Sequence, residues 1–332
     1  LDAISGKETS RIKTANGPGM TIFSPDGKYA YVCSSFNPET VVVTVADHQI
    51  AARLKQDSPF CPNIAVTPDG AQLWFTLKDV GEVMAFNARP PFNLLKTIAT
   101  GPITNHVNFA RNRLGSFAYV SVGGRNEVRV FRTSDFGLVK TIPVGKLPHG
   151  IWPSGDGTRV YVGLENDDAL VAIDTLTNEP IATIPIGQAP QAVVYVPNAV
   201  TRGDGSSGLE PLGVAGRTLH LTLAQASRPM AADRPTSVAL FDQGLVQVIQ
   251  AAVSGLAPKT PHVLALSERA RGDGKLEPLA VFTTNPAGAA LVNAVGPIRQ
   301  LVRSQVEAQR RYLVIAAGTP DKLGPVVQVQ AP

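Results

Sequence analysis

The chain has 332 residues, 44% of them hydrophobic and 17% charged, a length and composition that support packed cores and exclude a disordered chain. Its formal net charge of +4 is spread along the sequence without a basic stripe or interleaved aromatic residues, so nucleic acid is not expected as a partner. No apolar run approaches the roughly 20 residues of a membrane-spanning helix, and 27 prolines and 30 glycines favour a turn-rich, all-β protein.

Short strand patterns recur along residues 18–197 with a similar opening. The opening segments begin near residues 18, 62, 106, 148 and 190, a spacing of about 43 residues that is typical of propeller blades with four strands. Each opening leads through a Gly-, Asp- or Pro-containing turn into a second strand, as at 29–32, 73–76, 117–120 and 158–163. A sheet with two apolar faces cannot cover both alone, so the copies must pack against one another.

These repeats resemble the bacterial YVTN-type β-propeller repeat family. The resemblance rests on three Tyr-Val pairs, on two Pro-Asp-Gly turns and on one strand, namely Tyr31-Val32, Tyr119-Val120, Tyr161-Val162, the turns at Pro25 and Pro68, and residues 140–145. It covers about residues 1–197 and implies a propeller fold but no single activity. The family usually forms seven blades, which we expect for the intact protein, with ring closure by strand exchange between the chain ends as the alternative.

The first residues match the end of a repeat. Residues 1–7 correspond to residues 173–179, where a third strand ends and turns. We therefore expect N-terminal sequence to be missing, in which a secretory signal and one or more blades could precede Leu1.

Two cysteines indicate the compartment. Cys33 ends the second strand of one predicted blade, and Cys61 precedes the first strand of the next. Both positions lie on the same rim of a propeller, so a disulfide between neighbouring blades is predicted, which favours a periplasmic or extracellular protein. Two buried free thiols are the alternative.

The repeat register ends after Pro197. We assign residues 1–198 to the propeller repeats, 199–216 to a polar linker and 217–332 to a β-sandwich-like module, because strand patterns follow at intervals typical of a sandwich. They fall at 217–225, 237–241, 245–253, 262–267, 279–284, 289–295 and 312–316. Residues 302–311, rich in Arg, Gln, Glu and Ala, could instead form a short helix.

Polar side chains should converge at one mouth of the propeller channel. The segments that lead into the first strands and the loops after the second strands meet there, and such a concave mouth is the default ligand site. The first group comprises Asn63, Asn105, His106, His149 and Gln191; the second comprises Ser34, Ser35, Asn37, Lys78, Asp79, Arg125, Asn126, Glu165, Asn166 and Asp167. We predict ligand binding by Asn63, Asn105, His106, His149, Gln191 and Asn166. Each of them could instead cap a strand or bind water.

The two mouth histidines occupy nearly the same register in adjacent blades. His106 and His149 alone are too few for a zinc or copper centre, so no cofactor is expected, although Glu165 or Asp167 could complete a set of two imidazoles and one carboxylate. His48, His220 and His262 are interpreted as structural or solvated.

Sequence signatures of several enzyme classes are absent. There is no Gly-x-Ser-x-Gly elbow, no phosphate-binding Gly-rich loop, no His-Glu-x-x-His and no Cys-x-x-Cys-His. We therefore favour a non-catalytic extracytoplasmic binding or scaffold protein that recognises a protein or a small molecule. The alternative is a lactonase-like hydrolase, since related propellers place carboxylate, Asn and His groups at the channel mouth. Its catalytic groups would be Glu165, His149 and His106, with Asn63.

Overall fold

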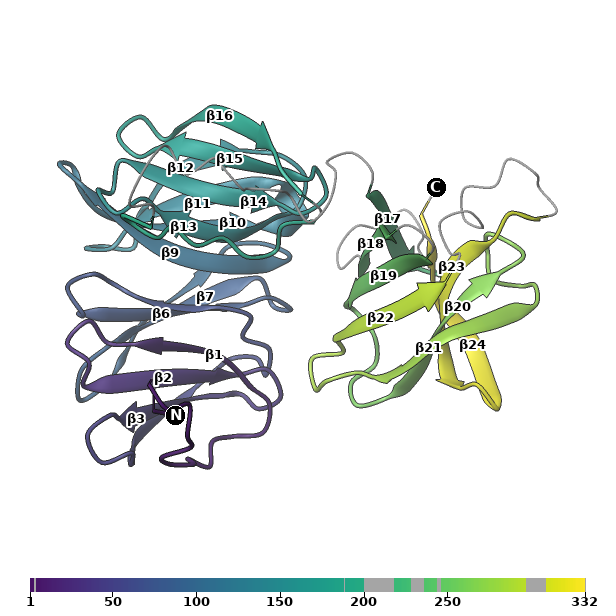
Figure 1. The fold of residues 1–332 in the computed structure, drawn as a ribbon, viewed down its shortest axis with the longest axis horizontal. Helices are drawn as coiled ribbons and strands as arrows, with labels where there is room; N and C mark the ends of the chain where they lie inside the picture. The colour runs from purple at the N-terminus through teal and green to yellow at the C-terminus, as the bar shows by residue number, and fades with distance from the viewer. Residues whose placement is uncertain are drawn as a thin grey trace.

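The computed structural model describes residues 1–2, 4–187, 189–199, 218–227, 236–243, 246–296 and 309–331. These residues form an all-β protein, with a short 3-10 turn at Gly123–Arg125 between two of its strands. Figure 1 shows a column of small sheets from the first half of the chain and, beside it, a larger curled sheet from the second half. None of the described segments is a helix of the length and apolarity needed to cross a membrane.

Residues 18–185 form four antiparallel sheets, each with its four strands in chain order. The first contains β1 (Pro18–Phe23), β2 (Tyr29–Ser34), β3 (Glu39–Thr44) and β4 (Ile50–Lys55). The second contains β5 (Ile64–Val66), β6 (Gln72–Leu77), β7 (Glu82–Asn87) and β8 (Leu94–Ala99). The third contains β9 (Thr104–Asn112), β10 (Gly115–Val122), β11 (Glu127–Arg132) and β12 (Leu138–Pro143). The fourth contains β13 (Pro148–Pro153), β14 (Arg159–Leu164), β15 (Ala169–Asp174) and β16 (Glu179–Pro185).

The four sheets pack as propeller blades, with their first strands β1, β5, β9 and β13 side by side in succession. The hydrophobic clusters lie between the blades: Val42 and Phe75 share one, Trp74 and Phe109 the next, and Val128 with Val171 the last. The all-β propeller fold expected from the repeat spacing is thereby confirmed.

One tyrosine position in the second strand contacts the part of the chain that packs on the blade's next face in three of the four sheets. The hydroxyl of Tyr31 donates to the carbonyl of Ala88, and the hydroxyl of Tyr119 donates to Oδ1 of Asn178 at 2.7 Å. Burial raises the pKa of Tyr31 to about 12, so the hydroxyl stays protonated. Tyr161, at the same register, stacks on Tyr195 with ring centroids 6.1 Å apart.

Residues 189–199 follow the fourth blade and form no strand. They nevertheless pack against that blade. The backbone of Val193 lies close to Gly150, and that of Pro190 lies close to Gly163. A first strand forms only when a second strand pairs with its backbone. Residues 200–217, which include most of the predicted linker, lie outside the described residues.

The second unit is one antiparallel sheet of eight strands, in the order β21-β20-β23-β24-β17-β18-β19-β22. Its strands are β17 (Leu219–Gln225), β18 (Thr236–Gln243), β19 (Val246–Val253), β20 (Pro261–Ser267), β21 (Leu276–Thr283), β22 (Ala290–Gly296), β23 (Tyr312–Thr319) and β24 (Lys322–Gln330). The sheet curls until its edge strands β21 and β22 meet, and this encloses a core that contains Leu240, Ile249 and Leu264. Sandwich-like packing therefore arises from a single continuous sheet.

The strand β24 is absent from the sequence-based expectation because its pattern contains Gly324-Pro325. The pairing with β23 is irregular there, between Ala316↔Val326 and Gly318↔Leu323, and β17 pairs only with residues 328–330. Proline is tolerated at such a bulge, where its missing N–H removes no ladder bond. The alternative helix at 302–311 falls largely on residues outside the described ranges.

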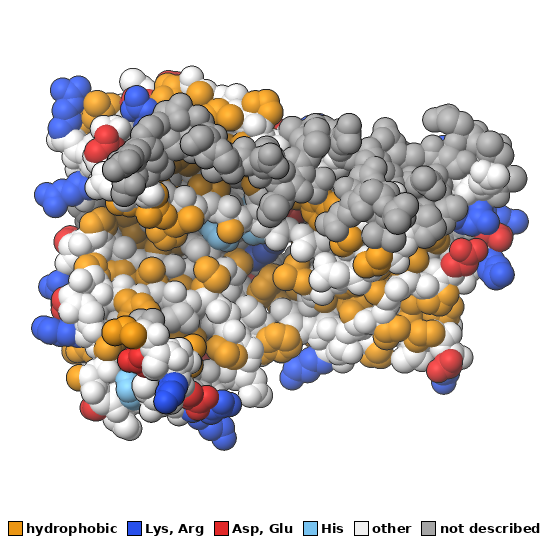
Figure 2. All heavy atoms as spheres, viewed as in Figure 1, with side chains coloured by type: hydrophobic (Ala, Val, Ile, Leu, Met, Phe, Trp, Pro, Cys, Tyr) orange, Lys and Arg blue, Asp and Glu red, His pale blue; other side chains and the backbone are white. Residues whose placement is uncertain are grey.

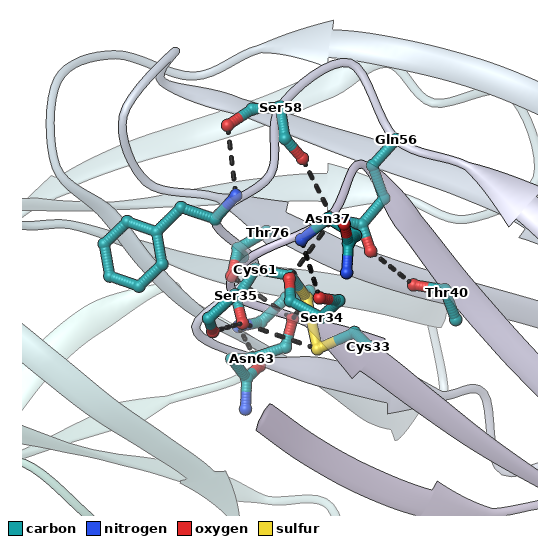
Figure 3. The surroundings of a disulfide bond; sticks show 12 residues. Cys33, Ser34, Ser35, Asn37, Thr40, Gln56, Ser58, Cys61, Asn63 and Thr76 are labelled. Atoms are coloured by element: carbon teal, nitrogen blue, oxygen red, sulfur yellow. Dashed lines mark hydrogen bonds between the residues drawn. A yellow bond between two sulfur atoms is a disulfide. The ribbon is translucent and has the colours of Figure 1, made fainter. Parts of the chain in front are cut away.

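The predicted disulfide is confirmed. Cys33 of β2 and Cys61 before β5 are bonded, with Cα atoms 6.0 Å apart, and both side chains are fully buried. Figure 3 shows the bond among polar side chains that hold the loop between the blades. Gln56 accepts a hydrogen bond from Thr40 at 2.8 Å and donates to the carbonyl of Ser58 at 2.9 Å. The bond therefore links the first two blades covalently at one rim.

We predict that Tyr119→Phe lowers the free energy of unfolding of the propeller by about 1–2 kcal/mol, because it leaves the buried Oδ1 of Asn178 without its donor. Tyr161→Phe is the matched control, since its hydroxyl has no hydrogen-bond partner among the described residues. Denaturant unfolding followed by circular dichroism measures both. An equal loss in the two variants would contradict the role assigned to the tyrosine hydroxyl.

Candidate functional site

The histidines predicted for the mouth meet between the third and fourth blades. His106 lies in β9 and His149 in β13, the two first strands that pack side by side. Their ring centroids are 5.1 Å apart with planes at 88°. The hydroxyl of Ser121 accepts from the backbone N–H of His106 at 3.0 Å and donates to the carbonyl of His149 at 2.6 Å. This hydroxyl fixes the two strands relative to each other.

Glu165 completes the cluster from the loop after β14. Its Oε2 lies 2.7 Å from Nδ1 of His149, and its Oε1 accepts from Nε2 of Gln191 at 3.1 Å. The side chain of Glu165 is 4% exposed and that of His149 is 12% exposed. Four of the predicted residues, His106, His149, Glu165 and Gln191, thus form one buried group, which we call the mouth cluster.

The predicted asparagines bond to protein groups around this cluster. Oδ1 of Asn63 accepts from the backbone N–H of Val107, and Nδ2 of Asn105 donates to the carbonyl of Pro148, each at 2.8 Å. Oδ1 of Asn105 is buried and has no partner among the described residues. Asn63 and Asn105 therefore join neighbouring blades through these hydrogen bonds, and their role in ligand binding stays a prediction.

The loops after the second strands divide into structural and exposed groups. The hydroxyl of Ser34 accepts from the backbone N–H groups of Phe36 and Asn37, and Oδ1 of Asn126 accepts from the N–H of Leu147. In contrast, the side chains of Lys78 and Arg125 make no hydrogen bond or ion pair with any described residue. The cationic side chains of this group are the ones left available to a ligand.

Burial and charge control protonation in the mouth cluster. Burial lowers the pKa of His106 well below its usual value, helped by the positive charges of His149 and Lys78. Burial likewise lowers the pKa of His149, against the hydrogen bond to Glu165. For Glu165, burial acts to raise the pKa, but the hydrogen bond from His149 and the charges of His149 and Lys78 outweigh it, so the pKa is lowered. The three shifts favour the carboxylate form of Glu165 and the neutral form of both imidazoles.

The C-terminal module covers this mouth. Oε1 of Gln250 accepts from Gln191 at 3.3 Å, and Ser237 donates to Asn166 at 3.3 Å. His220 lies 3.0 Å from Asp168 through Nε2 and Oδ1. These contacts involve the second-strand loop of the fourth blade and the segment after that blade. The sequence contains no signal for them, because they depend on how the two units dock.

A pocket of about 490 Å³ opens between the two units beside the mouth cluster. It is lined by loops of the second and third blades and by two turns of the module: Phe60, Lys78, Asp79, Val80, Gly81, Ala99, Thr100, Gly101, Pro102, Ile103, Arg125, Arg129, Ser254, Gly255, Ala287 and Ala289. Figure 2 shows histidine and Lys or Arg atoms at the surface where the two halves meet. Lys78 connects pocket and cluster, since it lines the first and its charge acts on the second.

A metal at this mouth is not supported. Within the described ranges, no three His, Cys, Asp or Glu side chains are placed to hold an ion. Glu165 instead directs one carboxylate oxygen to His149 and the other to Gln191.

Comparison with solved structures finds a fold of the same kind. Hydrazine synthase of Kuenenia stuttgartiensis superposes with a TM-score of 0.50 at 15% sequence identity, covering 98% of this chain and 90% of that chain. At this identity the likeness shows the propeller-like fold alone. No protein-family model matches the sequence. No curated protein matches it either.

We predict that stability falls as the pH decreases from 7 to 5. The unfolded state takes up protons below the usual histidine pKa of 6.5, whereas folded His106 and His149, whose pKa values burial lowers, take up fewer at the same pH. Each such group can reduce the free energy of unfolding by at most about 1.4 kcal/mol per pH unit. His106→Gln should flatten the dependence, measured by thermal unfolding across pH. His48→Gln, on an exposed outer turn, is the control. A slope unchanged by His106→Gln would contradict the prediction.

Proposed function

We propose that this chain is a non-catalytic binding protein of the YVTN propeller type whose small-molecule site lies between the propeller mouth and the C-terminal module. The observation that carries the proposal is the pocket of about 490 Å³ lined by both units. Its volume lies within the range of about 300–1,000 Å³ usual for ligand sites. A site at a junction between two units is also the usual location of a ligand pocket.

An extracytoplasmic location forms part of the proposal. A buried disulfide between Cys33 and Cys61 supports it, because such bonds persist in oxidising compartments and are rare in the cytosol. We place the protein in the periplasm or outside the cell.

The pocket is tested by blocking it. Val80 lines the pocket and is 43% exposed, so Val80→Trp should fill it without disturbing a core. Leu114→Trp, at an exposed turn away from the lining residues, is the matched control. In a fragment screen by ligand-observed NMR, we expect compounds that bind wild type and Leu114→Trp to bind Val80→Trp at least about tenfold more weakly. Equal binding to all three proteins, or no binding to wild type, would contradict the proposed function.

A hydrolase is the second candidate, and the pairing of His149 with Glu165 favours it. A carboxylate at 2.7 Å from Nδ1 orients the ring, so that the other ring nitrogen could take a proton from water. Lowering of the His149 pKa keeps that nitrogen unprotonated near neutral pH.

Lactone hydrolysis, assayed with and without divalent metal, separates the two candidates. Under the binding proposal, wild type and His149→Ala show the same background rate. Turnover by wild type and by His48→Ala that disappears in His149→Ala would establish the hydrolase instead.

A further inference from the structure

The pocket between the units carries an excess of positive charge. Three cationic side chains, Lys78, Arg125 and Arg129, line it with one carboxylate, that of Asp79. Arg129 is paired with Glu127 at 2.8 Å. The hydroxyl of Ser58 donates to Asp79, which holds that carboxylate toward the 58–60 segment. The side chains of two cations of the lining, Lys78 and Arg125, therefore remain without a hydrogen bond or ion pair among the described residues.

Gly101 leaves room for the Arg125 side chain beside the pocket. Gly101 has φ +127°, and a Cβ at that position would lie 2.8 Å from Nε of Arg125. Only glycine leaves room for the guanidinium group to cross the chain here. Arg125 ends the 3-10 turn, and Asn126 follows in a left-handed conformation, which turns the chain into β11. Arg125 thus lies beside Gly101, where loops of the second and third blades line the pocket.

Lys78 lines the pocket, and its charge acts on the mouth cluster. Burial lowers its pKa, with the carboxylate of Glu165 as the opposing influence. Glu165 already binds His149 and Gln191 through its two oxygens. A partly desolvated ammonium without a direct partner gains from an incoming anion, because a charge-assisted hydrogen bond replaces lost hydration.

The rest of the lining is largely apolar. Phe60, Val80, Ile103 and Pro102 come from the propeller, and Ala287 with Ala289 come from the turn before β22. Apolar walls with a small number of convergent charged groups define the chemistry of a ligand: the walls bind an apolar body, and the charges orient one polar end.

We infer that this pocket binds an organic anion with an apolar body, whose carboxylate or phosphate group sits between Lys78 and Arg125. The inference rests on the proposed function and specifies its ligand class. Because propeller and module both line the pocket, the bound anion also stabilises their docked arrangement.

Isothermal titration of the full chain with three matched probes tests the inference. The probes are 4-phenylbutyrate, 4-phenylbutyl phosphate and the neutral 4-phenylbutyramide, and the variants are Lys78→Met and Arg125→Gln. Lys96→Met, on the exposed outer strand β8, is the control. We expect at least one acid to bind about tenfold tighter than the amide, and each pocket variant to lose about tenfold in affinity for it. The stronger of the two acids identifies the anionic group.

Three results would overturn the inference. If the amide binds as tightly as the acids, the pocket binds ligands without selecting anions. The inference would then be wrong, and the proposed function would be unaffected. Acid binding unchanged in Lys78→Met and Arg125→Gln would place the anion elsewhere. Failure of all three probes would exclude this ligand class, while the Val80→Trp screen still decides the proposed function.

Discussion

The structure depends on the need of each four-stranded sheet to cover two apolar faces. The second and third blades each share one face with the blade before and one with the blade after, and the first and fourth blades share one face with a neighbour, so the hydrophobic clusters form between sheets. Packing of this kind sets the first strands side by side. Side chains at nearly the same register in β9 and β13 then meet, which is how His106 and His149, one residue apart in register, come into contact.

The site follows from a second layer of contacts built on that packing. Ser121 fixes the two histidine strands, Glu165 satisfies His149, and Gln191 joins Glu165 to Gln250 of the module. Burying these groups together lowers the histidine pKa values and retains a carboxylate in the interior. A pocket then opens where the module does not reach the loops of the second and third blades. The two units therefore meet both at the mouth cluster and around the pocket.

Repeat spacing was sufficient to predict the blades, the disulfide and the convergence of His106 with His149, because all three depend on register within one repeated unit. Lys78 and Arg125 could be assigned to the mouth, but their lack of side-chain partners could not be foreseen, since pairing depends on side-chain positions.

The strand β24 was not predicted because Gly324-Pro325 breaks its pattern, and a bulge accommodates that break only in the folded sheet. Contacts such as Ser237 with Asn166 join segments far apart in sequence, and no local pattern encodes them.

Docking of the module on the propeller mouth is the central claim, and a designed cross-link tests it most directly. Oγ of Ser237 and Oδ1 of Asn166 lie 3.3 Å apart across the junction. The double variant Asn166→Cys and Ser237→Cys should form a disulfide within one chain under mild oxidation, detected by peptide mapping without reduction, beside the native bond between Cys33 and Cys61. Free thiols at both new positions in the folded, monomeric protein would contradict the docked arrangement and the site derived from it.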